Sequence, residues 1–133
     1  MRRPTCTDSS SVPSVLVVDD DADIREFLSA FLSFQGYEVT TAANGAEALR
    51  QLHLAKPCVI LLDLMMPVMD GVEFRRRQRA LEEGADIPVL CLSAKYDARE
   101  IASALGMDAC LLKPFEPEAV ADAVRRFCPP DED

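Results

Sequence analysis

Short apolar runs alternate with helix-like segments along most of the chain. The runs at 15–18 and 58–62 consist entirely of apolar residues, as in strands buried on both faces of a sheet. Between the runs, apolar residues recur at helical spacing, for example at Ile24, Phe27, Leu28, Phe31 and Leu32. The alternation predicts an α/β fold in which right-handed helical crossovers join parallel strands and helices cover both faces of the sheet.

The same pattern predicts where the individual elements lie. Strands are expected at 15–18, 37–41, 58–62, 87–92 and 109–112. The first three helices are expected to begin after residues that favour helix caps, namely Asp21, Asn44 and Asp70. The helix after Asp70 is expected to run to Gly84, and two further helices should cover 98–105 and 120–127.

The two ends of the chain lack this periodicity. Residues 1–12 are polar, and residues 129–133 are Pro-Pro-Asp-Glu-Asp, so we expect two tails around one domain at 13–128. A length of 133 residues suits one domain. No output domain would fit in the tails, so a signal is expected to pass by contact or through a domain elsewhere. No apolar run approaches the roughly 20 residues that span a bilayer.

Charge and cysteine usage narrow the function classes. Lys and Arg number 14 against 23 Asp and Glu, a net charge of −9 that argues against direct nucleic-acid binding and against anionic membranes. Arginines at 75–79 are expected to form a solvated helical face. The scattered cysteines are expected to be reduced thiols in a cytoplasmic protein, packed as small apolar residues: Cys6, Cys58, Cys91, Cys110 and Cys128.

Polar side chains gather where the predicted strands end. Asp19 and Asp20 follow the first strand, Asp63 the third, Ser93 the fourth and Lys113 the fifth. In parallel sheets, ligands bind outside these carboxyl ends. Three carboxylates there require a counter-charge, and oxygen ligands favour Mg²⁺. With Lys113 and Ser93 to contact phosphoryl oxygens, the set predicts phosphoryl transfer to a carboxylate nucleophile.

These motifs resemble those of the receiver domains of two-component response regulators. The resemblance runs from about Ser14 to Phe127 and rests on motifs in the same order and separation, at 15–21, 61–71, 92–94 and 113–115. It implies a flavodoxin-like (βα)5 fold, with five parallel strands in the order 2-1-3-4-5 and helices on both faces.

The resemblance also implies roles for individual residues. Asp63 matches the phosphoacceptor of the family. Asp20 matches the acidic residue that binds Mg²⁺ directly, and Asp19 matches its neighbour, which acts largely through water. Met65 matches the position whose backbone carbonyl completes the metal site, so the type of its side chain is free.

The switch residues match the family except at one position. Ser93 matches the switch hydroxyl, Lys113 the lysine of the motif, and Pro114 a proline usually preceded by a cis bond. Three residues before the lysine, the family usually has Tyr or Phe, whereas this chain has Cys110. Cysteine cannot swing a ring between two sites, which puts the usual aromatic readout in doubt. Lys95 is a further position expected to tune the site.

The resulting expectation is a phosphorylation-controlled switch rather than a turnover enzyme. The chain would take a phosphoryl group from a sensor histidine kinase or phosphotransfer protein onto Asp63, and would catalyse only its own phosphorylation and dephosphorylation. The modification would alter a face formed by the fourth helix, fifth strand and fifth helix, at about 97–127, that binds a downstream protein. A monomer or weak dimer is expected.

Three other functions remain open at this point. A receiver-like scaffold independent of phosphorylation is compatible with Cys110. A magnesium-dependent phosphatase with an aspartyl nucleophile would generally need a second aspartate two residues after Asp63, where this chain has Met65. A flavin-binding module would need a phosphate loop after the first strand, where three aspartates stand instead.

Overall fold

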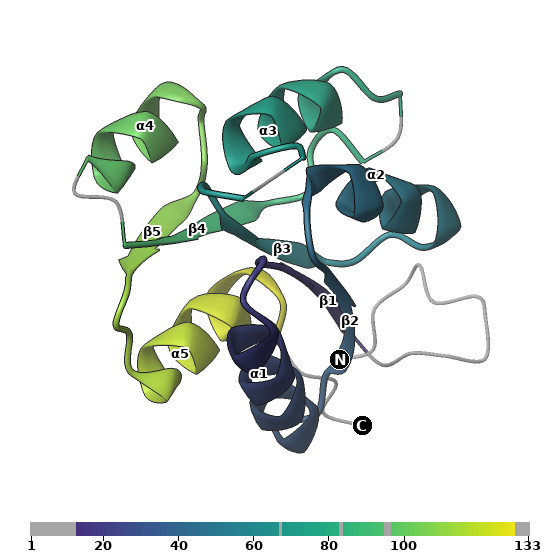
Figure 1. The fold of residues 1–133 in the computed structure, drawn as a ribbon. Helices are drawn as coiled ribbons and strands as arrows, with labels where there is room; N and C mark the ends of the chain where they lie inside the picture. The colour runs from purple at the N-terminus through teal and green to yellow at the C-terminus, as the bar shows by residue number, and fades with distance from the viewer. Residues whose placement is uncertain (1–12, 67, 83, 95–96, 130–133) are drawn as a thin grey trace.

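A five-stranded parallel sheet forms the centre of the molecule (Figure 1). The computed structural model describes residues 13–66, 68–82, 84–94 and 97–129. In this part of the chain the strands are β1 (Ser14–Val18), β2 (Glu38–Ala42), β3 (Val59–Asp63), β4 (Val89–Ser93) and β5 (Ala109–Leu112). The helices are α1 (Ala22–Phe34), α2 (Gly45–Leu54), α3 (Gly71–Arg79), α4 (Ala98–Ala104) and α5 (Pro117–Phe127).

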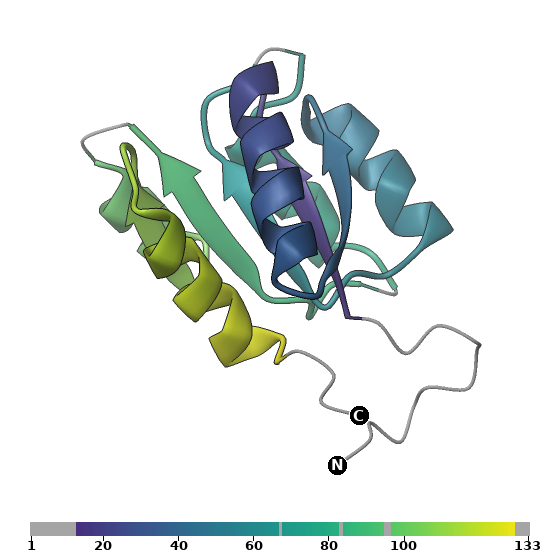
Figure 2. The same ribbon diagram turned by 90° about the horizontal axis from the view of Figure 1, so that it is seen from below.

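The strand order is β2-β1-β3-β4-β5, with every neighbouring pair parallel, which confirms the predicted fold class. Helices α1 and α5 cover one face of the sheet, and α2, α3 and α4 cover the other (Figures 1 and 2). The order reverses at β1 and β3, so the carboxyl ends of these central strands meet where ligands bind in such sheets.

Alternation along each buried strand divides the core between the two helical layers. Val15 and Val17 of β1 pack in the cluster that includes α1 and α5, whereas Leu16 and Val18 pack in the cluster that includes α2 and α3. Successive strand side chains point to opposite faces, so a strand covered on both faces must be apolar throughout. This is why the continuous apolar runs predicted strands correctly.

The predicted helix caps are present. The side chains of Asp21, Asn44 and Asp70 each accept a hydrogen bond from a backbone N–H in the first helical turn. The expected end of α3 was wrong, because the helix stops at Arg79 instead of continuing to Gly84. The buried Gln78 side chain donates to carbonyls beyond the helix, including Gly84 O at 2.7 Å, and so holds the chain as it turns back.

The arginine-rich face of α3 is not entirely solvated, which corrects the sequence expectation. Arg75 is only 6% exposed. Its guanidinium donates to Leu105 O at 3.0 Å, Gly106 O at 2.7 Å and Gln78 Oε1 at 2.6 Å. Arg75 therefore holds the carbonyl end of α4 against α3, a contact that local sequence spacing cannot predict.

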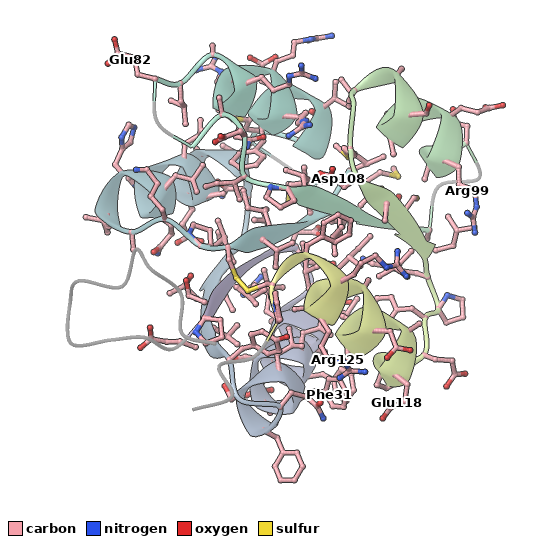
Figure 3. All side chains as sticks on the ribbon, turned by 180° about the vertical axis from the view of Figure 1, so that it is seen from behind. Phe31, Glu82, Arg99, Asp108, Glu118 and Arg125 are labelled. Carbon is pink, nitrogen blue, oxygen red and sulfur yellow. A yellow bond between two sulfur atoms is a disulfide. The ribbon has the colours of Figure 1, made fainter. Side chains whose placement is uncertain are left out.

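The expectation of separate reduced thiols is also wrong for one pair. Cys58, just before β3, and Cys128, at the end of α5, form a disulfide, which Figure 3 shows as a yellow bond. Cys91 and Cys110 remain free thiols, and Cys6 lies outside the described residues. Arg125 of α5, labelled in Figure 3, donates to Oε1 of Gln35, directly after α1, at 3.4 Å. Across the described residues, no helix is long and apolar enough to cross a membrane.

Candidate functional site

Three carboxylates and one ammonium meet at the carboxyl end of the sheet. Oxygen atoms of Asp19, Asp20 and Asp63 all lie within 4.8 Å of one another. The Nζ of Lys113 lies 2.8 Å from Asp19 Oδ2 and 3.4 Å from Asp63 Oδ2. Four of the residues singled out at the strand ends therefore form one cluster.

Asp19 is held in this cluster by its backbone as well as by its side chain. Its N–H donates to Ala42 O at 3.1 Å, which continues the β1–β2 ladder past the end of β1. Its carbonyl accepts from the Arg25 guanidinium at 2.8 Å, and its Oδ1 accepts from the Asp21 N–H at 2.9 Å. The buried carboxylate is thus fixed, with Oδ2 facing Lys113.

Asp63 is held by the turn that follows β3. The Met65 N–H donates to Asp63 Oδ1 at 3.2 Å. Gly71, the first residue of α3, packs so closely that a Cβ added there would lie 2.5 Å from Asp63 O and 2.8 Å from the Cα of Leu64. Only glycine permits this approach, so Gly71 sets how α3 rests on the end of β3.

Burial dominates the electrostatics of Asp63. Desolvation raises the pKa of its carboxyl to about 6. The Met65 N–H and the Lys113 ammonium act in the opposite direction, whereas the neighbouring Asp19 charge raises the pKa further. For Lys113, burial alone would lower the pKa, but the two carboxylates outweigh it and the pKa is raised. The lysine is therefore a fixed positive charge at neutral pH.

The donor set fits a hard divalent cation. Among the described residues, this acidic cluster offers only carboxylate oxygens, which Mg²⁺ prefers over nitrogen or sulfur ligands. Asp20 is exposed, and a hollow of about 470 Å³ opens beside it, lined also by Met65 and Asp70. Mg²⁺ usually keeps several waters, and such an open site can accommodate them.

The other predicted site residues lie around this cluster. Ser93 is buried at the end of β4, and its carbonyl accepts from the Lys113 N–H at 2.8 Å, beside the ammonium-bearing side chain. The Lys113–Pro114 peptide is cis, as the resemblance implied. Lys95 lies outside the described residues. The metal role of the Met65 carbonyl stays a prediction, and the Met65 side chain is 56% exposed.

Cys110 does not join the acidic cluster. It lies opposite Cys91 in the β4–β5 register and packs in the small core beneath α4, against Leu64, Ala98 and Ala102. The Cys110 thiol takes up much less space beneath α4 than the aromatic ring that the family usually has at this position.

Two contributors to the site were not singled out from the sequence. Arg25 lies one turn after the capping Asp21, and from there its guanidinium reaches back to Asp19 O at the end of β1. Gly71 was noted only as part of a helix start. A glycine at the first helical position, directly after an aspartate cap, was the available signal for its close packing.

A second, apolar hollow of about 590 Å³ is lined in part by Lys113. Ile24 and Phe27 of α1 line one side, and Pro114 and Phe115 of the β5–α5 connection line the other. Phe27 is 46% exposed, although its helical spacing predicted a buried position. An exposed ring at this position provides apolar surface next to the charged Lys113.

Known proteins share both this fold and this sequence pattern. Residues 15–125 match the family model described as the response regulator receiver domain. The chain is 46% identical to the transcriptional regulatory protein PrrA of Mycobacterium leprae over 107 residues, 79% of this chain and 45% of that protein. It is 42% identical to response regulator MprA of Mycobacterium sp. over 123 residues, 89% of this chain and 53% of that protein.

Among solved structures, the chemotaxis response regulator CheY4 of Vibrio cholerae matches with a TM-score of 0.81 and 37% identity. That match covers 87% of this chain and 98% of that one. The present chain spans about half the length of the curated relatives that it matches. Together with the matched family model, these findings show that the chain belongs to the family of response regulator receiver domains.

Proposed function

We propose that this chain is a phosphorylation-controlled switch in which Asp63 accepts a phosphoryl group from a histidine kinase or phosphotransfer protein. The observation that carries the proposal is the meeting of Asp19, Asp20 and Asp63 within 4.8 Å, with Lys113 3.4 Å from the Asp63 carboxylate. A buried carboxylate nucleophile beside a fixed cation has the parts that aspartyl phosphorylation needs.

In the proposed reaction, an Asp63 oxygen attacks phosphorus and forms the acyl phosphate, while the bond to the donor imidazole nitrogen breaks. Asp19, Asp20, Asp63 and the Met65 carbonyl would hold Mg²⁺, which supplies positive charge to the phosphoryl oxygens when bound. Lys113 stays paired with Asp19 and contacts a phosphoryl oxygen on Asp63. The Ser93 hydroxyl donates to another phosphoryl oxygen and so senses the modification.

The phosphodonor is a protein, and the apolar hollow beside Lys113 supports a docking position for it. Phe27, which is 46% exposed, and the half-buried Phe115 both line this hollow. A donor protein that buries these rings would bring its phosphohistidine to the Asp63 side of the sheet. Helix α1 and the β5–α5 connection are therefore inferred to recognise the donor.

The output is inferred to pass through α4, β5 and α5. Asp63 of β3 lies opposite Leu92 of β4, and Ser93 is the next residue of β4. The new phosphate charge at Asp63 attracts the Ser93 hydroxyl. Cys110 makes an aromatic swing unavailable, so α4 itself is inferred to move over its small core.

Relatives are named transcriptional regulators, and the effector here is proposed as a protein domain, either in the same longer chain or separate. We further propose that the chain acts in the cytoplasm as a monomer or weak dimer and does not itself contact nucleic acid.

A small phosphodonor tests the proposed chemistry. The protein is incubated with acetyl phosphate and Mg²⁺, and its intact mass is measured; one phosphoryl group per chain is expected. Asp63→Asn should remain unlabelled, and Asp86→Asn, an exposed aspartate in a loop, serves as the matched control and should label normally. Equal labelling of wild type and Asp63→Asn would reject the acceptor. Absence of labelling in the wild type would favour the phosphorylation-independent scaffold, and release of many phosphates per chain would favour a phosphatase.

A further inference from the structure

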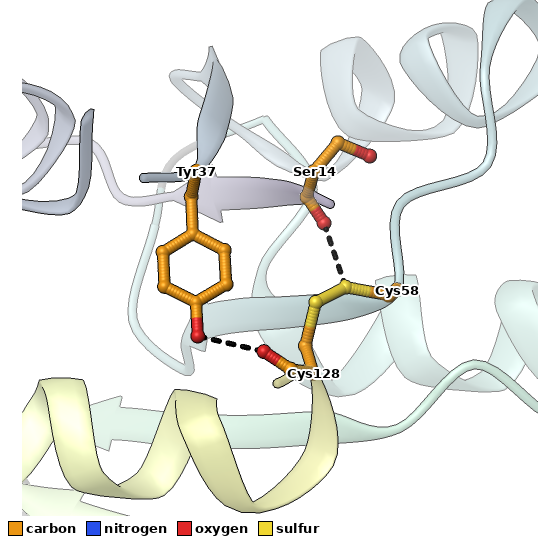
Figure 4. The surroundings of a disulfide bond; sticks show 4 residues. All are labelled: Ser14, Tyr37, Cys58 and Cys128. Atoms are coloured by element: carbon orange, nitrogen blue, oxygen red, sulfur yellow. Dashed lines mark hydrogen bonds between the residues drawn. A yellow bond between two sulfur atoms is a disulfide. The ribbon is translucent and has the colours of Figure 1, made fainter. Parts of the chain in front are cut away.

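Two cysteines that are distant in sequence meet at the amino-terminal end of the parallel strands, whereas the acidic cluster lies at their carboxyl end. Cys58 directly precedes β3 and Cys128 directly follows α5, 70 residues later, and their Cα atoms are 5.7 Å apart. Figure 4 shows the bond joining them. The Cα separation lies inside the usual range of disulfides, about 4.4–6.8 Å. The fold thus closes a long loop between the sheet and its last helix.

The surroundings of this pair suit both oxidation states. Sγ of Cys58 lies 3.2 Å from Ser14 O (Figure 4). The disulfide sulfur has no proton, so in the oxidised state this is a close contact, and only reduction to the Cys58 thiol would supply a proton to donate to Ser14 O. In the disulfide state Ser14 O still accepts from the Cys58 N–H at 2.9 Å. Oxidation therefore leaves no carbonyl without a partner.

Other contacts hold the end of α5 in place without help from sulfur. The Tyr37 hydroxyl donates to Cys128 O at 2.6 Å, and the Cys128 N–H donates to Val124 O at 2.7 Å. Cys128 is only 2% exposed, whereas Cys58 is half-buried. Because these contacts fix Cys128 beside Cys58, the pair is positioned for bond formation before oxidation occurs.

We propose that Cys58 and Cys128 form a reversible redox modification site that fixes α5 to the sheet. The oxidant is a low-molecular-weight disulfide. The Cys58 thiolate, the more accessible of the two, attacks one sulfur of the oxidant, which forms a mixed disulfide and releases one small thiol. The Cys128 thiolate then attacks Sγ of Cys58 and releases the second small thiol. The protein loses two electrons and two protons, and the oxidant gains them.

The position of the bond predicts which property it changes. Cys58 stands at the start of β3 and Asp63 at its end, about 17 Å apart at the rise of a strand. Phosphorylation should therefore proceed at the same rate in both redox states. Helix α5 belongs to the proposed output face, so the bond should instead restrict that face; this consequence rests on the proposed function.

The test uses the complete protein with glutathione disulfide or with dithiothreitol. After oxidation under native conditions, alkylation and peptide mapping should find a Cys58–Cys128 linkage, with Cys91 and Cys110 still as thiols. Dithiothreitol should restore both thiols while the protein stays folded. The oxidised form should show slower amide exchange near residues 124–128 and a melting temperature about 10 °C higher. Cys58→Ser and Cys128→Ala should remove both shifts, and Cys6→Ser should keep them.

Each outcome bears on the proposal. Alkylation of both Cys58 and Cys128 after oxidation, linkage of either to another cysteine, or reduction only after unfolding would overturn it. Slower acetyl phosphate labelling in the oxidised protein than in the reduced protein would contradict the expectation that a bond at the start of β3 leaves phosphorylation at its end unchanged. If neither redox state accepts phosphate, the proposed function fails, while the thiol mapping still decides whether the modification site exists.

Discussion

The ammonium of Lys113 lies closer to Asp19 than to Asp63, at 2.8 Å from Asp19 Oδ2. The buried Asp19 carboxylate is thus the principal partner of the lysine in the unmodified protein. Asp63 shares the cation at the longer distance of 3.4 Å and keeps a raised pKa. This division leaves the candidate nucleophile less strongly paired than its neighbour.

Removal of the lysine should therefore destabilise the protein through Asp19. With Lys113→Met in EDTA, the free energy of unfolding should fall by about 2 kcal/mol, because a buried carboxylate loses its counter-charge. Urea denaturation followed by circular dichroism measures this, since the chain has no tryptophan. Adding Asp19→Asn to Lys113→Met should recover much of the loss. An unchanged stability in Lys113→Met would contradict the pairing.

The raised pKa of Asp63 predicts a gain of stability on neutralisation. The folded pKa of about 6 exceeds the ordinary value of 3.8, so folding disfavours the charged form and stability falls as pH rises between these values. In EDTA at pH 7.5, Asp63→Asn should be more stable than wild type by on the order of 1–2 kcal/mol. Near pH 4 the gain should disappear.

The matched control for this pH series is Asp86→Asn, since Asp86 is an exposed loop aspartate. Its effect on the free energy of unfolding should be small and should not vary between the two pH values. A loss of stability in Asp63→Asn at pH 7.5 would mean that the Met65 and Lys113 contacts outweigh the burial of the carboxylate.

Neighbouring aspartates should differ sharply in their effect on Mg²⁺ binding. Asp20→Asn removes one carboxylate from the proposed Mg²⁺ site, so Mg²⁺ affinity measured by calorimetry should fall roughly tenfold or more. Asp21→Asn should change it by less than about twofold, because Asp21 caps α1 and asparagine caps equally well. Equal losses in the two variants would indicate a general effect of surface charge.

The buried arginine of α3 should be important for stability, whereas its neighbour should not. Arg75→Ala removes the donor of the Gly106 carbonyl and leaves the Leu105 carbonyl with only the longer bond from Arg79, so it should cost about 2 kcal/mol in the free energy of unfolding. The Arg76 side chain is 67% exposed and pairs, among the described residues, with Glu73, so Arg76→Ala should cost less than about 0.5 kcal/mol. A cost for Arg75→Ala as small as that expected for Arg76→Ala would show that the contact between Arg75 and the end of α4 contributes little to stability.

Sequence reasoning succeeded where the pattern is local. The buried strands were predictable because residues covered on both faces must be apolar, and Asp19, Asp63 and Lys113 were predictable because strand ends converge in a parallel sheet. The burial of Arg75 and the pairing of Cys58 with Cys128 depend on contacts between distant segments. A pattern read along the chain cannot distinguish such residues from exposed arginines and separate thiols.

The central claim is that Asp63 carries the phosphoryl group, and chemical mapping of the acyl phosphate tests it most directly. Protein labelled with acetyl phosphate and Mg²⁺ is reduced with borohydride, which converts a phosphorylated aspartate to homoserine, and its peptides are sequenced by mass spectrometry. The account predicts homoserine at position 63 in the labelled sample and none when EDTA replaces Mg²⁺. Homoserine at position 19, 20 or 21 instead, or at no position in a sample whose mass shows the added phosphoryl group, would contradict it.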